Sequence, residues 1–163
     1  MPTVDDARQL AEVLVESVIA GYAGLFDDAS LHQLAMPHAV RERALGLKER
    51  FVDESETFIA AKVGGRVAGW AALRSDSTAT VELDSFYIRP THWGTGVADA
   101  LLQRVTQIAT GNGFTTIELW TLADNARARR VYERNGYSLN AETRTLSYLG
   151  EEVQQVRYIK PLD

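Results

Sequence analysis

The stretch Trp93-Gly94-Thr95-Gly96-Val97-Ala98 decides the fold of this chain, because a predicted strand ends before it and a predicted helix begins in it. The preceding segment, Thr80–Ile88, is rich in residues that favour strands. After the glycines, apolar residues recur at helical spacing: Val97, Ala98, Leu101, Leu102, Val105, Ile108 and Ala109. The first turn of a helix has unpaired N–H groups and a positive dipole end, and glycines leave these donors open to an anion. The stretch therefore predicts an anion site at a helix N-terminus.

Two other phosphate-binding motifs do not fit this turn. A P-loop requires Gly-Lys followed by Ser or Thr, whereas Val97-Ala98 follows Gly96. The dinucleotide fingerprint needs a third glycine or alanine where Asp99 stands. Glu118, which could imitate the ribose-binding acid, lies within a predicted strand and not at its end. From the loop alone, an ordinary turn whose glycines only satisfy the backbone is the alternative interpretation.

Helical segments precede the strands in the predicted order. A helix is expected over residues 5–20, because its apolar residues lie on one helix face. A short helix around residues 31–34 is expected to be capped by Asp28 and Ser30. A third helical stretch is expected to begin at Pro37 and to reach about Lys48.

The strands are expected to form a mixed sheet. Strand-like runs at residues 58–63 and 66–73 flank Gly64-Gly65, which is a typical hairpin turn. Further along, the sequence predicts a strand over 115–122, a helix over 126–134, and strands near 143–148 and 153–159. Hairpins beside one strand–helix–strand unit imply an α/β fold, with a mixed sheet flanked by helices.

Composition limits the class of protein. The 163 residues carry a formal net charge of −5, which argues against a general nucleic-acid binder. The absence of cysteine excludes thiolate nucleophiles and is compatible with a reducing cytoplasm, the location we expect. No apolar run reaches the roughly 18 residues of a membrane span, and Met1–Asp6 lacks the start of a signal peptide. We expect a single domain over residues 1–163, without linkers or repeats.

A second motif lies about 30 residues after the glycine turn, and the two together are far more specific than either alone. It reads Asp124-Asn125-Ala126-Arg127-Ala128-Arg129-Arg130-Val131-Tyr132-Glu133-Arg134-Asn135-Gly136-Tyr137. With both motifs, the chain resembles the GCN5-related N-acetyltransferase (GNAT) superfamily. The resemblance implies a mixed, mostly antiparallel sheet flanked by helices, with a splayed central strand pair. It also implies acetyl-CoA as the cofactor.

The resemblance assigns the cofactor site residue by residue. The family's Gln/Arg-x-x-Gly-x-Gly/Ala signature falls on Trp93-Gly94-Thr95-Gly96-Val97-Ala98, where Gly96 and Ala98 match. Trp93 replaces the usual Gln or Arg, so binding of the cofactor pyrophosphate is assigned to the backbone N–H groups from Gly94 to Ala98. Free N–H groups of Phe86-Tyr87-Ile88 are implied to pair with the pantetheine, and the one at Ile88 to polarise the thioester carbonyl. Asn125 matches a pantetheine-binding asparagine and is also a plausible helix cap.

The same resemblance supplies candidate catalytic residues. Tyr132 matches the family's general acid, although the sequence pattern alone favours a core tyrosine. Glu82 occupies the position that is most often acidic, and Asp84 shares its strand face. A carboxylate there could accept the ammonium proton directly or through water, while a polar strand face without catalytic duty is an equal alternative. Trp120 stands where some members that acetylate protein N-termini carry glutamate.

We expect direct, sequential acetyl transfer from acetyl-CoA to a primary amine, with a small molecule as the leading acceptor. The alternatives are a protein N-terminus or lysine as acceptor, and a catalytically silent acyl-CoA-binding regulatory module. Tyr22, Phe26 and Trp70 are candidates for the acceptor pocket, although core packing is favoured for each. The three histidines show no ligand spacing, so no metal site is expected. A homodimer through edge strands near the C-terminus is an open option.

Overall fold

The computed structural model describes residues 2–75 and 77–162, so three positions of the expected 1–163 domain (1, 76 and 163) lie outside the described residues. The elements in chain order are η1 (Val4–Asp6), α1 (Ala7–Gly21), α2 (Asp28–Gln33), α3 (Pro37–Arg50), β1 (Glu56–Val63), β2 (Arg66–Arg74), β3 (Thr80–Ile88), η2 (Pro90–His92), α4 (Val97–Gly111), β4 (Thr116–Leu122), α5 (Ala126–Arg134), β5 (Ser138–Tyr148) and β6 (Glu151–Pro161). In the described ranges, no helix combines the length and apolar character that crossing a membrane requires.

Most of the predicted elements are confirmed, and β3 and α5 have the expected bounds. The predicted cap of α2 was wrong. Asp27 is the cap, and its Oδ1 accepts a hydrogen bond from the Ser30 N–H at 2.9 Å. The helix includes Asp28 as its first residue, so the capping side chain must come from the residue before it. Strands β5 and β6 are longer than predicted, because each supplies the other's backbone partners over residues without clear strand patterning.

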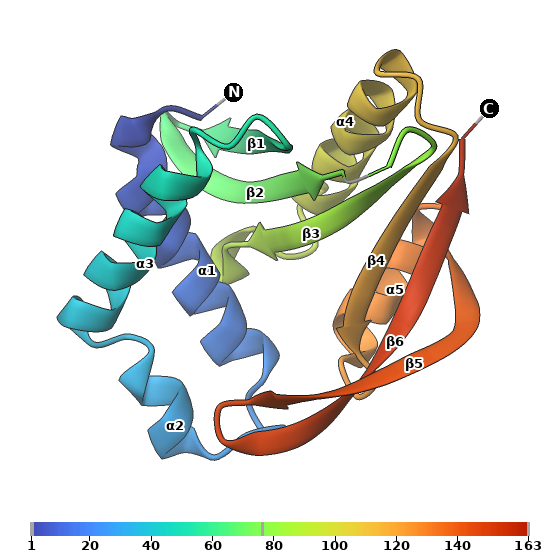
Figure 1. The fold of residues 1–163 in the computed structure, drawn as a ribbon. Coiled ribbons are helices and arrows are strands. Elements are labelled where there is room, and N and C mark those ends of the chain that lie inside the picture. Colours follow the sequence, from blue (N-terminus) through green and yellow to red (C-terminus); the bar gives the residue numbers. More distant parts are fainter. Residues whose placement is uncertain (1, 76, 163) are drawn as a thin grey trace.

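The sheet has six strands in the order β1-β2-β3-β4-β6-β5 (Figure 1). Every neighbouring pair is antiparallel except β3 and β4, which run parallel. That parallel pair holds register only at Thr80–Glu82 against Thr116–Glu118, and beyond these residues the two strands part. The mixed, mostly antiparallel sheet with a splayed central pair is thereby confirmed.

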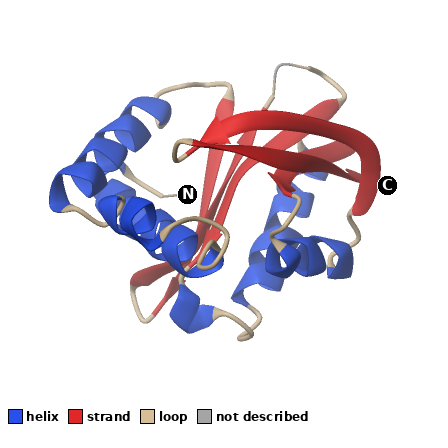
Figure 2. Cartoon of the chain, turned by 90° about the horizontal axis from the view of Figure 1, so that it is seen from below, coloured by secondary structure: helices blue, strands red, loops and turns tan. Residues whose placement is uncertain are grey.

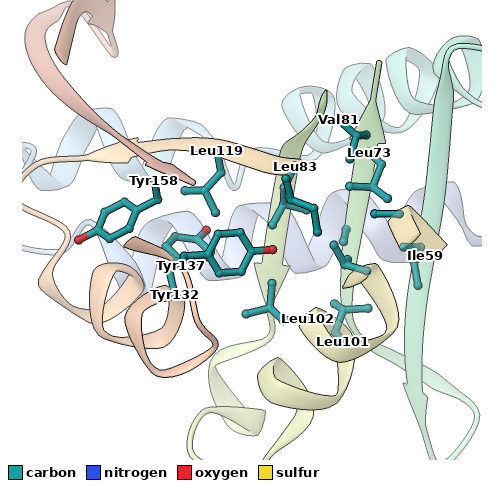
Figure 3. Close-up of a cluster of buried hydrophobic side chains, with 14 of the residues drawn as sticks. Ile59, Leu73, Val81, Leu83, Leu101, Leu102, Leu119, Tyr132, Tyr137 and Tyr158 are labelled. Carbon is teal, nitrogen blue, oxygen red and sulfur yellow. The ribbon is translucent and has the colours of Figure 1, made fainter. Parts of the chain in front are cut away.

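Helices cover both faces of the sheet (Figure 2). On one face, α1 and α3 pack on β1 and β2 in a core that includes Leu10, Val67 and Trp70. On the other face, α4 and α5 enclose a second core, in which Tyr132, Tyr137 and Tyr158 gather beside aliphatic side chains of β3, β4 and α4 (Figure 3). The β5–β6 hairpin bends back toward α1 and α2 (Figure 1), where Tyr148, Leu149 and Val153 pack against these helices.

A bulge in β3 determines which of its side chains face α4 and which face α1. Leu73 pairs with Leu83 and Ala72 with Ser85, so Asp84 is the extra residue between two regular pairs. Because strand residues alternate between faces, an inserted residue reverses the alternation beyond it. Val81 and Leu83 before the bulge, and Phe86 and Ile88 after it, therefore all pack toward α4. Tyr87 is turned to the α1 face.

Gly69 lets β2 approach the end of β3 closely. It pairs with Ile88, and a Cβ at this position would lie 2.5 Å from Ile88 Cδ1 and 2.9 Å from the Tyr87 carbonyl oxygen. A backbone oxygen cannot move as a flexible side chain can. Any side chain at Gly69 therefore forces the two strands apart where β3 leaves β4.

We predict that Gly69→Ala lowers the free energy of unfolding by about 1–3 kcal/mol, because it overpacks this contact. Gly46→Ala is the matched control, since a Cβ at Gly46 in α3 meets nothing within 4 Å. The control should be neutral or stabilising by up to about 1 kcal/mol through helix propensity. Urea unfolding followed by circular dichroism measures both, and equal stability of the two variants would contradict this packing argument.

Candidate functional site

A cavity of about 620 Å³ lies where β3 and β4 part. Its lining comes from α1, β3, the N-terminus of α4, β4, α5 and the β5–β6 hairpin. Since α1 covers one face of the sheet and α4 and α5 cover the other, the gap between the strands joins the two faces. Its volume lies within the range typical of small-molecule sites.

The glycine turn lines one end of this cavity. Gly94 and Gly96 have φ angles of +74° and +88°, which favour glycine, and Gly96 is the N-cap residue of α4. A Cβ at either glycine would meet nothing within 4 Å, so the approach to the first helical turn is open. Asp99 also lines this end. Hydrogen bonds from Asn135 and Arg134 hold its carboxylate and lower its pKa.

The end of β3 presents backbone groups to the gap. The Arg89 N–H donates to the Ala68 carbonyl of β2, and successive residues of a strand direct their backbone groups to opposite sides. The N–H and carbonyl of Ile88 therefore point away from β2 and toward β4, and so do those of Phe86. The Ile88 carbonyl accepts hydrogen bonds from Ser17 Oγ at 3.1 Å and from Trp93 Nε1 at 2.9 Å.

Trp93, which the sequence left unassigned, has two contacts. Its indole N–H fixes the end of β3, as described above, and its ring lies under the Arg127 guanidinium at 3.7 Å from Cζ to the ring centroid. A guanidinium over a tryptophan face is an attractive cation–π contact. Trp93 and Arg127 both line the cavity, so the stack holds a positive charge beside the glycine turn.

Tyr132 is held in an aromatic group at the centre of the cavity lining. Its ring packs against Phe86, Tyr137 and Tyr158, with centroid distances of 5.9, 5.8 and 6.1 Å. Figure 3 shows the three tyrosines together. Burial raises the pKa of the Tyr132 hydroxyl well above its usual value, so the hydroxyl stays protonated at neutral pH. The hydroxyl makes no hydrogen bond to any side chain or backbone group among the described residues, and it remains available to a ligand.

The two candidate bases are placed differently. Asp84 lines the cavity, whereas Glu82 is not among the lining residues. Arg74 Nη2 lies 3.0 Å from Glu82 Oε2 and 3.2 Å from Asp84 Oδ1. Asp84 Oδ2 also accepts from Arg50 Nη2 at 2.7 Å and from Ser85 Oγ at 3.0 Å. The two carboxylates thus share one guanidinium, and only Asp84 reaches the cavity.

The other predicted cofactor residues divide into two groups. Phe86, Tyr87, Ile88, Trp93, Gly94, Gly96, Ala98 and Asn125 line the cavity together with Tyr132. Asn125 Oδ1 also accepts from the Ala128 N–H at 3.1 Å, so it caps α5 while it lines the site. Thr95 and Val97 are not lining residues, because the Thr95 hydroxyl donates to the His92 carbonyl and Val97 packs on the core.

Several lining residues come from parts of the chain where the sequence carried no motif. Ser17, Tyr22, Trp120 and Tyr148 are four such residues. Of the side chains considered for an acceptor pocket, only Tyr22 lines the cavity. Phe26 packs behind it, and Trp70 is fully buried with its Nε1 donating to the Leu10 carbonyl. Contacts between α1 and the distant β5–β6 hairpin are non-local, so no local pattern could have revealed them.

The comparisons agree with this geometry. A family model described as the acetyltransferase (GNAT) family matches residues 26–137. An uncharacterised N-acetyltransferase of Mycobacterium tuberculosis and one of Mycobacterium bovis are each 34% identical over 97 residues, which is 60% of this chain. The match spans 62% of those relatives, less than two thirds of their length.

Solved structures share the fold at low sequence identity. PaiA N-acetyltransferase from Thermoplasma acidophilum, in complex with coenzyme A, superposes with a TM-score of 0.79 at 19% identity, covering 98% of this chain and 95% of that one. A putative phosphinothricin N-acetyltransferase gives a TM-score of 0.73 at 19% identity, covering 100% and 96%. At these identities the likeness establishes the fold.

We predict a coupling between Ser17 and Trp93, because both donate to the same buried carbonyl. Ser17→Ala and Trp93→Phe should each cost about 1 kcal/mol, since one donor remains in each variant. The double variant leaves the Ile88 carbonyl without either donor, so it should cost about 1–2 kcal/mol more than the sum. Urea unfolding of the four proteins measures this coupling, and strictly additive losses would show that the two donors do not act on one acceptor.

Proposed function

The chain belongs to the acetyltransferase (GNAT) family, and on this premise we propose that it transfers the acetyl group of acetyl-CoA to a primary amine. One observation carries the proposal. A single cavity passes between β3 and β4 and brings an open helix N-terminus, unpaired strand N–H groups and the Tyr132 hydroxyl to one space. Each is a group that acetyl transfer from a thioester requires.

The residues fit coenzyme A as the cofactor. The turn from Gly94 to Ala98 leaves open space beside the N–H groups of the first helical turn, which suits a pyrophosphate. Arg127, Arg130 and Arg134 line the same end and suit the phosphate charges. The N–H groups of β3 that face the gap can donate hydrogen bonds, and the Asn125 side-chain amide can donate and accept them. Both suit the pantetheine part of coenzyme A, which contains amide groups. The coenzyme A held by the Thermoplasma neighbour supports this assignment.

Acetyl-CoA supplies an acetyl group activated as a thioester. In the proposal, the Ile88 N–H donates to the thioester carbonyl, and Ser17 and Trp93 keep this strand end in place through the Ile88 carbonyl. A preorganised N–H stabilises negative charge that develops on that oxygen. Tyr132 holds its proton in a buried setting and donates it to the departing thiolate. Transfer is direct, because the sequence contains no cysteine to carry the acetyl group.

The proton of the attacking amine passes to the carboxylates of β3. Glu82 remains the predicted base because it occupies the position that is most often acidic in the family. Asp84 is the carboxylate that lines the cavity. Since Arg74 contacts both carboxylates, we propose that they act as one acceptor group, with Asp84 or a water molecule nearest to the amine.

The remaining expectations belong to the same proposal. We take residues 1–163 as one domain, the location as cytoplasmic and the acceptor as a small molecule. The net charge of −5 disfavours nucleic acid as a partner. The edge strand β5 is the surface through which a homodimer could form.

The test is thiol release from acetyl-CoA across a panel of amines and peptides, together with calorimetry of coenzyme A binding. Acetylation of one or more small amines supports the proposal. Acetylation of peptides alone would transfer the activity to a protein acceptor. Binding of coenzyme A without any turnover would favour a regulatory binding module, and failure to bind would contradict the cofactor assignment.

We predict that Tyr132→Phe lowers kcat by about 10²–10⁴-fold while the Kd for coenzyme A stays within a factor of about two, because only a proton donor is lost. Tyr137→Phe is the matched control. Its hydroxyl is also buried and unpaired, but Tyr137 does not line the cavity. Steady-state kinetics and calorimetry measure both variants, and an unchanged kcat in Tyr132→Phe would remove this residue from the mechanism.

We predict that Gly96→Asp abolishes coenzyme A binding, because it places bulk and negative charge in the open space beside the first turn of α4. Gly113→Asp is the control for strain and charge. Gly113 has a φ of +83° and lies beyond the opposite end of the same helix. Calorimetry should find parental affinity in the control, and retained affinity in Gly96→Asp would place the phosphates elsewhere.

A further inference from the structure

We infer that the acceptor is a small cationic amine with an apolar body and without a carboxylate or phosphate group. This inference rests on the proposed acetyl transfer and adds the chemical class of the acceptor. The half of the cavity on the α1 face, which we call the acceptor chamber, carries it. The chamber residues are Ser17, Tyr22, Asp84, Tyr87, Trp120, Leu146, Tyr148 and Gln155.

Four aromatic side chains form the walls of this chamber: three come from β3, β4 and β5, and Tyr22 comes directly after α1. Leu119 packs in the core on the α4 face, so Trp120, the next residue of β4, is directed to the α1 face. The bulge at Asp84 turns Tyr87 to the same face. Tyr22 and Tyr148 meet edge to face, with centroids 5.9 Å apart and planes at 83°, and close the far side.

The tyrosine hydroxyls of the chamber are neutral and lack protein partners. Burial raises the pKa of Tyr22 to about 12, and it raises the pKa values of Tyr87 and Tyr148 as well. None of the three hydroxyls donates or accepts a hydrogen bond within the described ranges, although all three residues line the cavity. Aromatic faces attract cations, and neutral hydroxyls can accept hydrogen bonds from an ammonium group.

The charged group beside the chamber favours a cation. Asp84 belongs to a cluster of three carboxylates and two guanidinium groups: Glu56, Glu82, Asp84, Arg50 and Arg74. The formal net charge of this cluster is −1. A positively charged amine that enters the chamber therefore meets a negative group and π faces, and both lower the cost of removing it from water.

None of the chamber residues is basic, and the nearby Arg50 and Arg74 are already paired with the carboxylates of the cluster. Of the described lining residues, the basic ones are Arg127, Arg130 and Arg134, which all belong to α5 on the opposite face. Arg144 lies near Trp120, but its guanidinium covers that ring at 4.4 Å and its Nε donates to Gln155 at 2.7 Å. A carboxylate on the acceptor would therefore be buried without a cationic partner, which is costly.

The two halves of the cavity thus differ in charge. The α5 end offers three arginines and helix N–H groups to a polyanionic cofactor, and the acceptor chamber offers aromatic rings and a net negative cluster. This division predicts that charge on the acceptor, more than its bulk, decides which amines react.

The experiment compares kcat/KM for phenethylamine, phenylalanine and phenylalaninamide at saturating acetyl-CoA. Phenylalaninamide keeps the branch at the α-carbon but lacks the negative charge, so it separates charge from size. We expect phenethylamine and phenylalaninamide to exceed phenylalanine by about tenfold or more, because one unpaired buried carboxylate costs at least that factor.

Equal or better use of phenylalanine would overturn the inference. Equally poor use of phenylalaninamide and phenylalanine would also overturn it, because size and not charge would then be the cause. Acetylation of none of the three compounds, with coenzyme A still bound in calorimetry, would overturn it as well. Loss of coenzyme A binding itself would instead contradict the proposed function, and with it this inference.

A pair of variants tests the aromatic wall directly. Tyr148→Phe loses only the hydroxyl and keeps the π face, whereas Tyr148→Leu loses both, so the KM for phenethylamine should be about five- to thirtyfold higher in Tyr148→Leu than in Tyr148→Phe. The Kd for coenzyme A serves as the control and should be unchanged in both, since Tyr148 belongs to the β5–β6 hairpin and not to the glycine turn or α5. Equal KM values in the two variants would contradict a cation–π role for this ring.

Discussion

The parting of β3 from β4 is the constraint on which the rest of the structure depends. Two parallel strands that hold register over three residues and then separate leave backbone N–H and carbonyl groups without strand partners. Such groups are costly when buried, so each must find another partner or face a ligand. The Ile88 carbonyl is satisfied by Ser17 of α1 and by Trp93. The N–H groups of Phe86 and Ile88 face the gap, where we propose that they bind coenzyme A.

Two features, a bulge in β3 and a glycine in β2, maintain this opening. The bulge at Asp84 reverses the alternation of the strand, so that Phe86 and Ile88 pack toward α4 while Tyr87 faces α1. Gly69 permits the close contact with Ile88 that holds the departing strand against β2. One strand thus contributes apolar packing on one face and part of the acceptor chamber on the other. The separation of charge between the two ends of the cavity follows from this arrangement.

The parts of the fold that could be predicted are those determined by residues close together in the sequence. The glycine turn, the helix that follows it and the motif from Asn125 to Tyr132 depend on capping, periodicity and backbone freedom, and their positions in the fold were predicted correctly. The cap of α2 was misassigned by one residue, because Asp27 and Asp28 are adjacent and equally suited to the role. The fold and the positions of the two motifs within it were therefore accessible from the sequence.

The residues of the acceptor chamber could not be predicted from local sequence. The family resemblance favoured Glu82 over Asp84, whereas Asp84 is the one that lines the cavity, and this depends on the bulge and on the positions of Arg50 and Arg74. Tyr148 enters the site because the β5–β6 hairpin bends back over α1, a contact between the two ends of the chain. Trp93, an apparent departure from the family pattern, became interpretable only through its bond to Ile88.

The central claim is that the unpaired N–H groups of β3 form the cofactor-binding edge of the gap. Residue-resolved amide hydrogen exchange, measured by NMR with and without saturating coenzyme A, tests it most directly. We expect exchange at Phe86 and Ile88 to slow when coenzyme A is added, while exchange at Arg89, already bonded to Ala68, stays the same. Unchanged exchange at Phe86 and Ile88 in the saturated protein would contradict it.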